Sequence, residues 1–357
     1  MSARQSVIVT GISGNLGRRL LPQLEDFDVI GVDVRPPDNR SLARFETVDF
    51  GTESSCTQLI DLLRETGASA IVHLAFVLDP LRAGVLEEER MWQINVAGTA
   101  RVMEAISVVN RHGGNVAKFI FPSSVSVYGP ETPPLVKEDH PLEAHTLPYA
   151  IHKKECDEVV RYRQEWMTGC RTVLLRPHIF SGATMQNYMV GALRGTPTGS
   201  GKRAEKMREQ GKRLPLLLPW GKQYLEKRLQ FVHVDDMARL IALLLRRDAT
   251  NDPQFTVLNV AGRGEALTLA QCAQVANAKI RRVPGRRICG TILRKMWDWG
   301  ISGIPPEALP YMIGSYTMDT SRLQRFLGSE YSNVIRYTVE EALRDSFSEQ
   351  AAAAAQS

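Results

Sequence analysis

The sequence predicts an α/β fold: a doubly wound, Rossmann-like parallel sheet followed by a smaller C-terminal α/β subdomain that binds substrate. Short apolar runs alternate with amphipathic helical runs through the first half of the 357 residues, and this alternation indicates a parallel sheet with helices on both faces. The apolar runs carry few polar residues, as expected for strands that are buried on both sides. A glycine-rich segment, residues 9–17, follows directly on the first run.

The individual elements follow from these patterns. We expect strands at 6–10, 29–34, 45–50, 70–75, 118–123 and 172–176, and helices near 15–25, 55–66, 87–111 and 149–167. Residues 181–230 are rich in Gly, Pro and basic residues and show no clean period. A helix at 235–247 and a strand at 256–261 then return to the sheet, and Thr268 is a plausible N-cap for a helix over 268–278. Thr338 and Glu341 have the spacing of a capping box.

These elements divide the chain into two parts. The sheet domain comprises 1–177 and 229–262, and the smaller subdomain comprises 178–228 and 263–345. The alanine-rich segment 346–357 is predicted to be a disordered tail or a frayed helix end.

Composition narrows the class of protein. With 43% hydrophobic and 23% charged residues, the chain has the balance of a soluble globular protein. We find no 18-residue apolar run that would span a membrane and no signal peptide, so we expect a cytoplasmic location. The five cysteines show no CxxC pattern and no metal-ligand spacing, which predicts ordinary thiols and no metal site.

The net charge of +5 is unevenly distributed. Residues 202–213 hold six basic and two acidic side chains, and residues 279–295 hold seven basic and none acidic. These segments are either solvated surface or the neighbours of an anionic substrate or an anionic membrane surface. Aromatic residues are not interleaved as in nucleic-acid-binding segments, so we expect no nucleic-acid partner.

The glycines at 11, 14 and 17 lie between a predicted strand and a predicted helix. At such a turn, small residues let the backbone approach a pyrophosphate, and free backbone N–H groups can bind it. Asp33 ends the second strand, where a carboxylate can accept both hydroxyls of an adenosine ribose and repel a 2′-phosphate. The cofactor is therefore predicted to be NAD rather than NADP. Asp49, after the third strand, would bind the adenine amino group or cap a turn.

Tyr149 and Lys153 are four residues apart on a predicted helix and so lie on one face. We expect the Lys153 ammonium to lower the pKa of Tyr149 and make it an acid/base near neutral pH. Upstream, Ser124 follows the fifth strand, at the edge where such sheets bind ligands. Its hydroxyl would hold a substrate oxygen against Tyr149.

Nine segments in order resemble the extended short-chain dehydrogenase/reductase family, in its NAD-dependent epimerase/dehydratase branch. They are TGISGNLG, Asp33, Asp49, HLAF at 73–76, INVAGT at 94–99, SSVSVYG, YAIHK, LLRPHIFSG at 174–182 and FVHVDDMA at 231–238. The resemblance covers residues 1–262 well and the remainder loosely. It implies an NAD-dependent enzyme that transfers a hydride at a secondary alcohol or ketone carbon, as a dehydrogenase, reductase or epimerase.

The resemblance also implies roles for individual residues. Ser124, Tyr149 and Lys153 would be catalytic, with Lys153 also binding the nicotinamide ribose, and Asn95 would support the active site. The implied cofactor-binding residues are Gly11, Ser13, Gly14, Asn15, Leu16, Gly17, Asp33, Asp49, Phe50, Leu74, Ala75, Phe76, Asn95, Pro122, Tyr149, Lys153, Pro177 and His178. The implied substrate-binding residues are Val77, Ser124, Ser126, Ile179 and Arg228. His233 and Asp235 have the pattern of a helix entry and cap.

Two positions depart from the nucleotide-sugar members of the family. Ile179 stands where these members usually have Asn, and Leu229 stands where they commonly have an Arg that binds the diphosphate, with Arg228 one position away. The absence of a Glu beside Ser124 also disfavours dehydratase chemistry. The substrate is therefore a nucleotide sugar or a less polar alcohol or ketone. The alternatives are a dehydrogenase resembling 3β-hydroxysteroid dehydrogenase and a non-catalytic NAD sensor. Family members are often homodimers, which implies an interface at helices 87–111 and 149–167.

Overall fold

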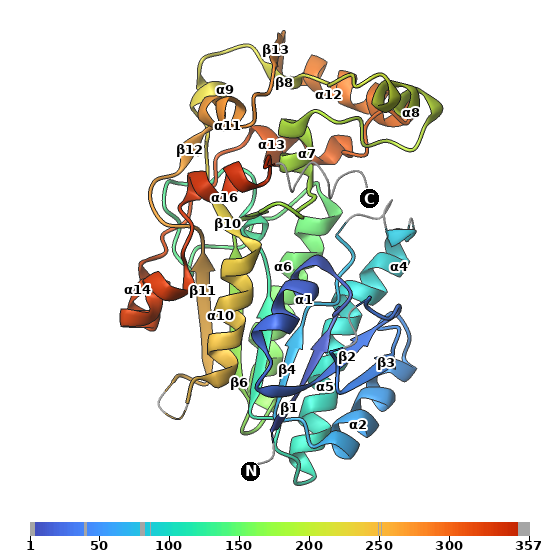
Figure 1. Ribbon diagram of the computed structural model, residues 1–357, viewed down its shortest axis with the longest axis vertical. Helices are drawn as coiled ribbons and strands as arrows, with labels where there is room; N and C mark the ends of the chain where they lie inside the picture. The colour runs from blue at the N-terminus through green and yellow to red at the C-terminus, as the bar shows by residue number, and fades with distance from the viewer. Residues whose placement is uncertain are drawn as a thin grey trace.

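The computed structural model describes residues 4–38, 41–78, 83–85, 87–248, 250 and 252–348. A helix–sheet–helix sandwich forms the lower part of the molecule in Figure 1, and a smaller lobe lies above it. The predicted fold class is confirmed. No described helix is long and apolar enough to cross a membrane.

Within the described residues, seven parallel strands form the main sheet in the order β11-β6-β5-β4-β1-β2-β3. The order reverses direction next to β1, so the carboxyl ends of β1 and β4 face the crevice where doubly wound sheets bind ligands. The strands are β1 (Gln5–Thr10), β2 (Phe27–Asp33), β3 (Arg44–Thr47), β4 (Ala70–His73), β5 (Lys118–Pro122), β6 (Arg171–Pro177) and β11 (Phe255–Val260). The expected strand 45–50 ends early, at Thr47.

Two apolar layers hold helices against the two faces of the sheet. One face packs against α1 (Asn15–Leu20), α10 (Val234–Arg246), α14 (Ser321–Leu327) and α15 (Tyr331–Val334). The other packs against α2 (Ser54–Thr66), α5 (Gly98–Arg111) and α6 (Pro148–Arg163). The expected helix 87–111 is not uniform: α4 (Glu88–Trp92) and α5 are joined by a π-helical turn, η2 (Gln93–Ala97). Such turns interrupt helices near functional sites.

The smaller lobe shares one apolar core cluster with the carboxyl edge of the sheet. Its elements include several in the segment 181–230, where the sequence showed no period. They are β7 (Ile179–Ser181), α7 (Tyr188–Arg194), α8 (Lys202–Glu209), β8 (Leu216–Pro219), α9 (Gln223–Glu226), β9 (Arg228–Leu229), β10 (Phe231–His233), β12 (Leu267–Thr268), α11 (Leu269–Val275), β13 (Ile280–Val283), α12 (Gly285–Asp298), α13 (Leu309–Ile313) and α16 (Val339–Asp345).

Local capping signals in this lobe are confirmed. Thr268 caps α11 and Thr338 caps α16, each with the reciprocal hydrogen bonds of a capping box. The predicted tail begins too early, because Ser346 is fully buried and its hydroxyl accepts the N–H of Gly182 at 2.9 Å. Residues 349–357 of that tail lie outside the described residues.

Candidate active site

The glycine turn joins β1 to α1 and packs against the loop that follows β4. Gly11 has a φ of +67°, and a Cβ there would lie 2.5 Å from the backbone nitrogen of Ala75. A Cβ on Gly17 would lie 2.4 Å from the carbonyl oxygen of Ile12. Both positions therefore require glycine for the fold of the turn itself. Thr10 completes this junction, because its hydroxyl oxygen accepts the N–H groups of Leu74 and Ala75 at 3.1 and 3.2 Å.

Gly14 differs from the other two glycines. It is exposed, it caps α1 without any side-chain hydrogen bond, and the one atom near an added Cβ would be the Gly11 oxygen at 3.1 Å. The N–H groups that follow it, on Asn15 and Leu16, belong to the first turn of α1, where backbone donors lack helical partners. This part of the turn fits a pyrophosphate.

Asp33 occupies the predicted ribose position at the carboxyl end of β2. Its two carboxylate oxygens accept the backbone N–H groups of Ser13 at 3.0 Å and Val34 at 2.7 Å. The Ser13 hydroxyl donates to the Arg35 carbonyl at 2.6 Å, which fixes the turn beside the carboxylate. Each carboxylate oxygen has a further lone pair, so Asp33 can accept hydroxyl groups while its orientation is held.

Asp49 has a partner that the sequence analysis missed. Its carboxylate pairs with the Arg90 guanidinium and accepts the Gly51 N–H at 2.9 Å. Arg90 also donates to the Gly51 carbonyl at 2.7 Å. The carboxylate therefore anchors α4 to the loop after β3, and its contact with adenine stays a prediction. The neighbouring Phe50 is buried, with its ring edge-on to that of His73.

The buried side-chain amide of Asn95 fixes the loop after β4. Asn95, in the π-helical turn, is fully buried and both accepts from Val77 N–H at 2.7 Å and donates to Val77 carbonyl at 3.1 Å. Asn95 therefore supports the loop after β4, and its predicted contact with the cofactor stays a prediction. Leu74, Ala75 and Phe76 remain half-buried and line the sheet edge. Val77 is buried, and its side chain is not part of the substrate cavity described below.

Ser124 and Tyr149 meet across that edge. The Ser124 oxygen accepts both the backbone N–H of Ser126 at 3.1 Å and the Ser126 hydroxyl at 3.0 Å. With both lone pairs engaged, the Ser124 hydroxyl hydrogen is left to donate. It reaches Tyr149, to which Ser124 is hydrogen-bonded. Ser124 and Tyr149 are therefore neighbours on the wall of the cavity described below.

The expectation that Lys153 lowers the pKa of Tyr149 is wrong for this structure. Burial raises the pKa of Tyr149 to about 12, and the hydrogen bond with Ser124 opposes that shift. The Lys153 ammonium instead donates to the Pro122 carbonyl at 2.8 Å and lies 3.7 Å from the centre of the Phe76 ring. Phe76 also packs edge-on against Tyr149, at 5.8 Å between ring centres. The sequence analysis did not consider that the Phe76 ring contacts both Tyr149 and Lys153.

Lys153 fits a cofactor ribose. It is buried, and burial lowers its pKa to about 8. An ammonium carries three N–H donors, and the Pro122 carbonyl is the acceptor that the structure gives to one of them. Two donors in a buried position are therefore free to bind a pair of hydroxyl groups, which a nicotinamide ribose would supply.

A buried ion pair that the sequence analysis missed holds helix α6 in place. Arg176 donates to both oxygens of Asp157, at 2.9 and 2.8 Å, and both side chains are fully buried. Asp157 also accepts the Ser123 hydroxyl at 3.0 Å, and Arg176 donates to the Tyr128 hydroxyl at 2.6 Å. The one available sequence signal was that Asp157 lies one turn beyond Lys153 on the same face of the helix.

A cavity of about 180 Å³ lies next to Ser124 and Tyr149. Its wall comes from the end of β5, the start of α6, the segment 177–189 and the segment 308–316. The lining residues are Leu78, Ser124, Val125, Ser126, Leu147, Tyr149, Pro177, His178, Ile179, Phe180, Met185, Gln186, Asn187, Tyr188, Met189, Ala308, Tyr311, Met312 and Tyr316.

The cavity contains three of the predicted substrate residues, Ser124, Ser126 and Ile179. His178 also lines it: its Nδ1 accepts the Ile179 N–H at 2.8 Å, and its Nε2 lies 2.9 Å from the Tyr316 carbonyl. Burial lowers the pKa of His178 to about 4, so the ring is neutral. Arg228 is exposed on β9, donates to the Ala266 carbonyl and is not among the residues that line the cavity, so its contact with substrate stays a prediction.

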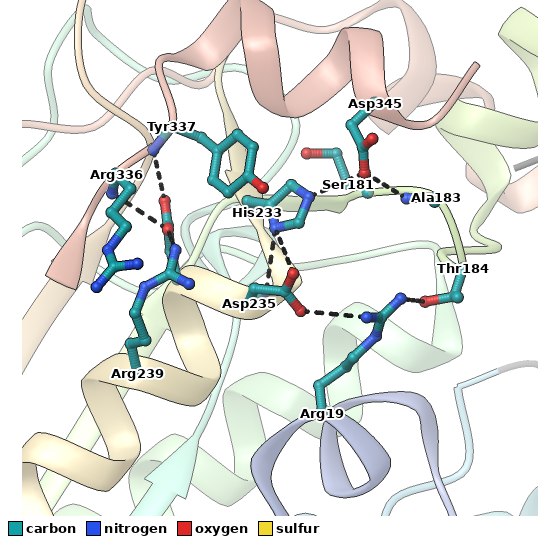
Figure 2. A network of polar contacts seen from close by, with 12 residues as sticks. Arg19, Ser181, Ala183, Thr184, His233, Asp235, Arg239, Arg336, Tyr337 and Asp345 are labelled. Atoms are coloured by element: carbon teal, nitrogen blue, oxygen red, sulfur yellow. Dashed lines mark hydrogen bonds and ion pairs between the residues drawn. The ribbon is translucent and has the colours of Figure 1, made fainter. Parts of the chain in front are cut away.

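A polar network joins the sheet domain to the smaller lobe (Figure 2). His233 is the N-cap of α10, as predicted: its Nδ1 accepts the Asp235 N–H at 3.1 Å, and its Nε2 lies 3.1 Å from Asp345. The Asp345 carboxylate also accepts the Ala183 N–H at 2.8 Å. The segment 181–184 is therefore tied to α10 and α16 together.

A second connection reaches the glycine turn. Asn15 donates to the Thr184 carbonyl at 2.7 Å, and Arg19 donates to the Thr184 hydroxyl at 3.2 Å. Arg19 also lies 3.6 Å from Asp235. The predicted cofactor turn and the wall of the cavity are thus linked through Thr184, and Asn15 has a structural partner in addition to its predicted role.

The chain belongs to the NAD-dependent epimerase/dehydratase family, whose model matches residues 7–261. This match confirms the family inferred from the nine segments and agrees with the expected NAD cofactor. An uncharacterized epimerase/dehydratase of Staphylococcus aureus (strain USA300) is 23% identical over 167 residues, which are 44% of this chain and 48% of that protein. The chain thus spans about half the length of the curated relatives it matches.

Solved structures share the fold over nearly the whole chain. The UDP-Glc/GlcNAc 4-epimerase of Campylobacter jejuni has a TM-score of 0.67 at 18% identity and covers 98% of this chain and 99% of its own. The Bordetella bronchiseptica enzyme WbmH, in complex with NAD⁺, has a TM-score of 0.63 at 18% identity and covers 98% and 100%. At these identities the likeness establishes the architecture and leaves the substrate open.

Proposed function

We propose that this protein is an NAD-dependent oxidoreductase that interconverts a secondary alcohol and a ketone. The observation that carries the proposal is the convergence of Ser124 and Tyr149 on one wall of a cavity, with the buried Lys153 behind them. The nucleotide would take up the hydride from the carbinol carbon, or return it. Tyr149 would move the hydroxyl proton, and Ser124 would hold the substrate oxygen.

The protonation state of Tyr149 determines whether it can donate a proton to a ketone or accept one from an alcohol. With its pKa raised to about 12, the phenol carries its proton at neutral pH and can donate it to the oxygen of a ketone as that oxygen gains charge. The Ser124 O–H stabilises the same oxygen. In the reverse direction Tyr149 must first lose its proton, which its burial opposes.

The residues that would hold NAD fit it. The open turn at Gly14 suits the pyrophosphate, the carboxylate of Asp33 suits the adenosine ribose, and the two free donors of Lys153 suit the nicotinamide ribose. A negative charge at Asp33 disfavours the 2′-phosphate of NADP. Epimerisation uses the same residues when the ketone turns over before the hydride returns.

The test compares wild type with Tyr149→Phe. We expect the variant to bind NAD as wild type does and to lose turnover by about 10²–10⁴-fold, the usual contribution of an acid/base. The control variant is Ser123→Ala. Ser123 is next to Ser124 in the sequence, but its hydroxyl donates to Asp157, so this variant reports the effect of a purely structural change. Equal turnover in Tyr149→Phe and wild type would overturn the catalytic assignment.

We also propose that the protein forms a homodimer through the helical segments 87–111 and 149–167. The aromatic side chains of Trp92, Tyr162 and Trp166 in these segments are exposed to 36%, 69% and 48%, respectively. Tyr162 and Trp166 pack edge-on with ring centres 5.1 Å apart, and contiguous exposed apolar groups mark interaction surfaces. Sedimentation of wild type and Trp166→Glu would test this: a monomeric wild type would refute it.

A further inference from the structure

The cavity beside Tyr149 carries no charged side chain in the part of the chain that the structure describes. Lysine, arginine, aspartate and glutamate are absent from its described lining, and His178 is neutral with both ring nitrogens engaged. Its far wall is made of Met185, Met189 and Met312. Methionine side chains are flexible and polarisable, and they adapt to irregular apolar ligands.

A second, much smaller cavity, of about 40 Å³, adjoins Met312. It is lined by α7, β8, α12 and α13, and its described lining is again free of charged side chains. The wall is formed largely by small and aliphatic residues, among them Leu216, Leu218, Leu293 and Ile304. Met312 lines both cavities, so this flexible side chain lies between the cavity beside Tyr149 and a second apolar space.

Five arginines of this lobe have partners outside the two cavities. Arg208 donates to the Pro197 and Gly199 carbonyls, Arg213 to the Arg194 carbonyl, and Arg282 to the Pro219 and Gly221 carbonyls. Arg286 pairs with Glu131 and Arg294 with Glu307. These five side chains of the basic segments 202–213 and 279–295 therefore brace loops or form ion pairs, and none of them lines either cavity.

We propose that the substrate of this site is an uncharged alcohol or ketone with a long apolar body, whose polar end lies at Ser124 and Tyr149 and whose far end passes Met312 into the second cavity. This inference rests on the proposed function. A nucleoside diphosphate sugar would bring two phosphate charges, and burying such charges without a cation is strongly unfavourable. An apolar chain, in contrast, gains from each methylene that leaves water.

The test measures binding and needs no turnover. Calorimetry on NAD-loaded wild type would compare straight-chain 2-alkanones, from 2-butanone to 2-decanone, with UDP-glucose. We expect affinity to rise up to about fourfold per methylene until the chain is accommodated, and no binding of UDP-glucose. Affinity that is independent of chain length, or tighter binding of UDP-glucose than of 2-decanone, would overturn the inference.

Met312→Trp tests the passage between the two cavities. The larger indole should remove the gain for the longest ketones, so the ratio of 2-decanone to 2-butanone affinity should fall. Ile288→Trp, on the exposed side of α12, introduces the same residue in the same lobe and should keep the full gain. Equal loss at every chain length in Met312→Trp would contradict the two-cavity arrangement.

Different results would contradict the proposed function and the proposed apolar substrate. If long ketones bind but Tyr149→Phe turns substrate over as wild type does, the proposed function fails and the apolar site stands. If UDP-glucose binds and Tyr149 is needed for its turnover, the proposed function stands and the apolar substrate is excluded.

Discussion

Arg176 and Asp157 form a bidentate ion pair in which both side chains are fully buried, with Nη2 and Oδ1 2.8 Å apart. The pair joins the end of β6 to the middle of α6, one helical turn from Lys153. Ser123, next to the predicted catalytic Ser124, bonds to the same carboxylate. The Asp157 carboxylate also pairs with Arg161 at 3.0 Å, so one buried carboxylate connects β6 and Ser123 to α6, the helix that carries Tyr149 and Lys153.

Asp157→Asn should destabilise the protein by about 3–5 kcal/mol, the usual effect of removing one partner of a buried pair. The amide would leave the Arg176 charge uncompensated and would turn N–H donors toward the guanidinium. Urea denaturation measures this difference. Asp61→Asn, an exposed carboxylate 4.0 Å from Arg64, should change the free energy of unfolding by well under 1 kcal/mol. Equal effects in the two variants would contradict a dominant role for the pair.

Lys153→Met should change how stability depends on pH. Burial lowers the pKa of Lys153 from 10.5 to about 8, so between these values the unfolded chain binds more protons than the folded one. Wild-type stability should therefore rise with pH across this window, by roughly 3 kcal/mol in total. The variant lacks the group and should lack the rise. Lys154→Met, with its side chain 30% exposed, is the matched control and should retain it.

His178 and His73 should make the protein sensitive to acid. Burial lowers the pKa of His178 to about 4 and that of His73 to about 3, from 6.5. As pH falls below 6.5 the unfolded chain takes up protons that the folded chain does not, so stability is lost, at about 1.4 kcal/mol per pH unit for each ring. His178→Asn should reduce this slope by about one proton. The control is His112→Asn at an exposed position. If stability depends on pH equally steeply in His178→Asn and His112→Asn, His178 is not held neutral in the folded protein.

Asp345→Ala should loosen the segment 181–184. The carboxylate accepts from Ala183 N–H and faces His233 Nε2, so its removal leaves buried donors unsatisfied and should cost about 1–3 kcal/mol. Amide exchange of this segment should increase more than that of the sheet. Glu340→Ala, on the same helix but paired with Arg344 at the surface, should leave the exchange unchanged. Protection that is equal in both variants would refute the role of Asp345.

The sequence predicted the sheet well because each strand carries its own signal in a short apolar run, and the two capping boxes are likewise local. The individual helices and strands of the segment 181–230 were missed because they are only two to eight residues long and lie between glycines and prolines. The Arg176–Asp157 pair, the Arg90–Asp49 pair and the lack of charged side chains in the described lining of the cavity depend on which distant segments meet. No local pattern reports that Arg228 donates to the Ala266 carbonyl.

The pKa of Tyr149 was mispredicted for a related reason. Spacing along a helix places Lys153 near the phenol, but it does not reveal that Phe76 and the Pro122 carbonyl contact the ammonium. Burial, a property of the whole fold, then decides the direction of the shift.

The most direct test of the account is a pair of binding isotherms for NAD and NADP, measured on protein stripped of any nucleotide that mass spectrometry finds on denaturation. With Asp33 at the end of β2 and the open turn at Gly14, we predict saturable binding of NAD and binding of NADP at least about tenfold weaker, a difference of about 1.4 kcal/mol. Binding of neither nucleotide, or tighter binding of NADP, would contradict the assignment of this site.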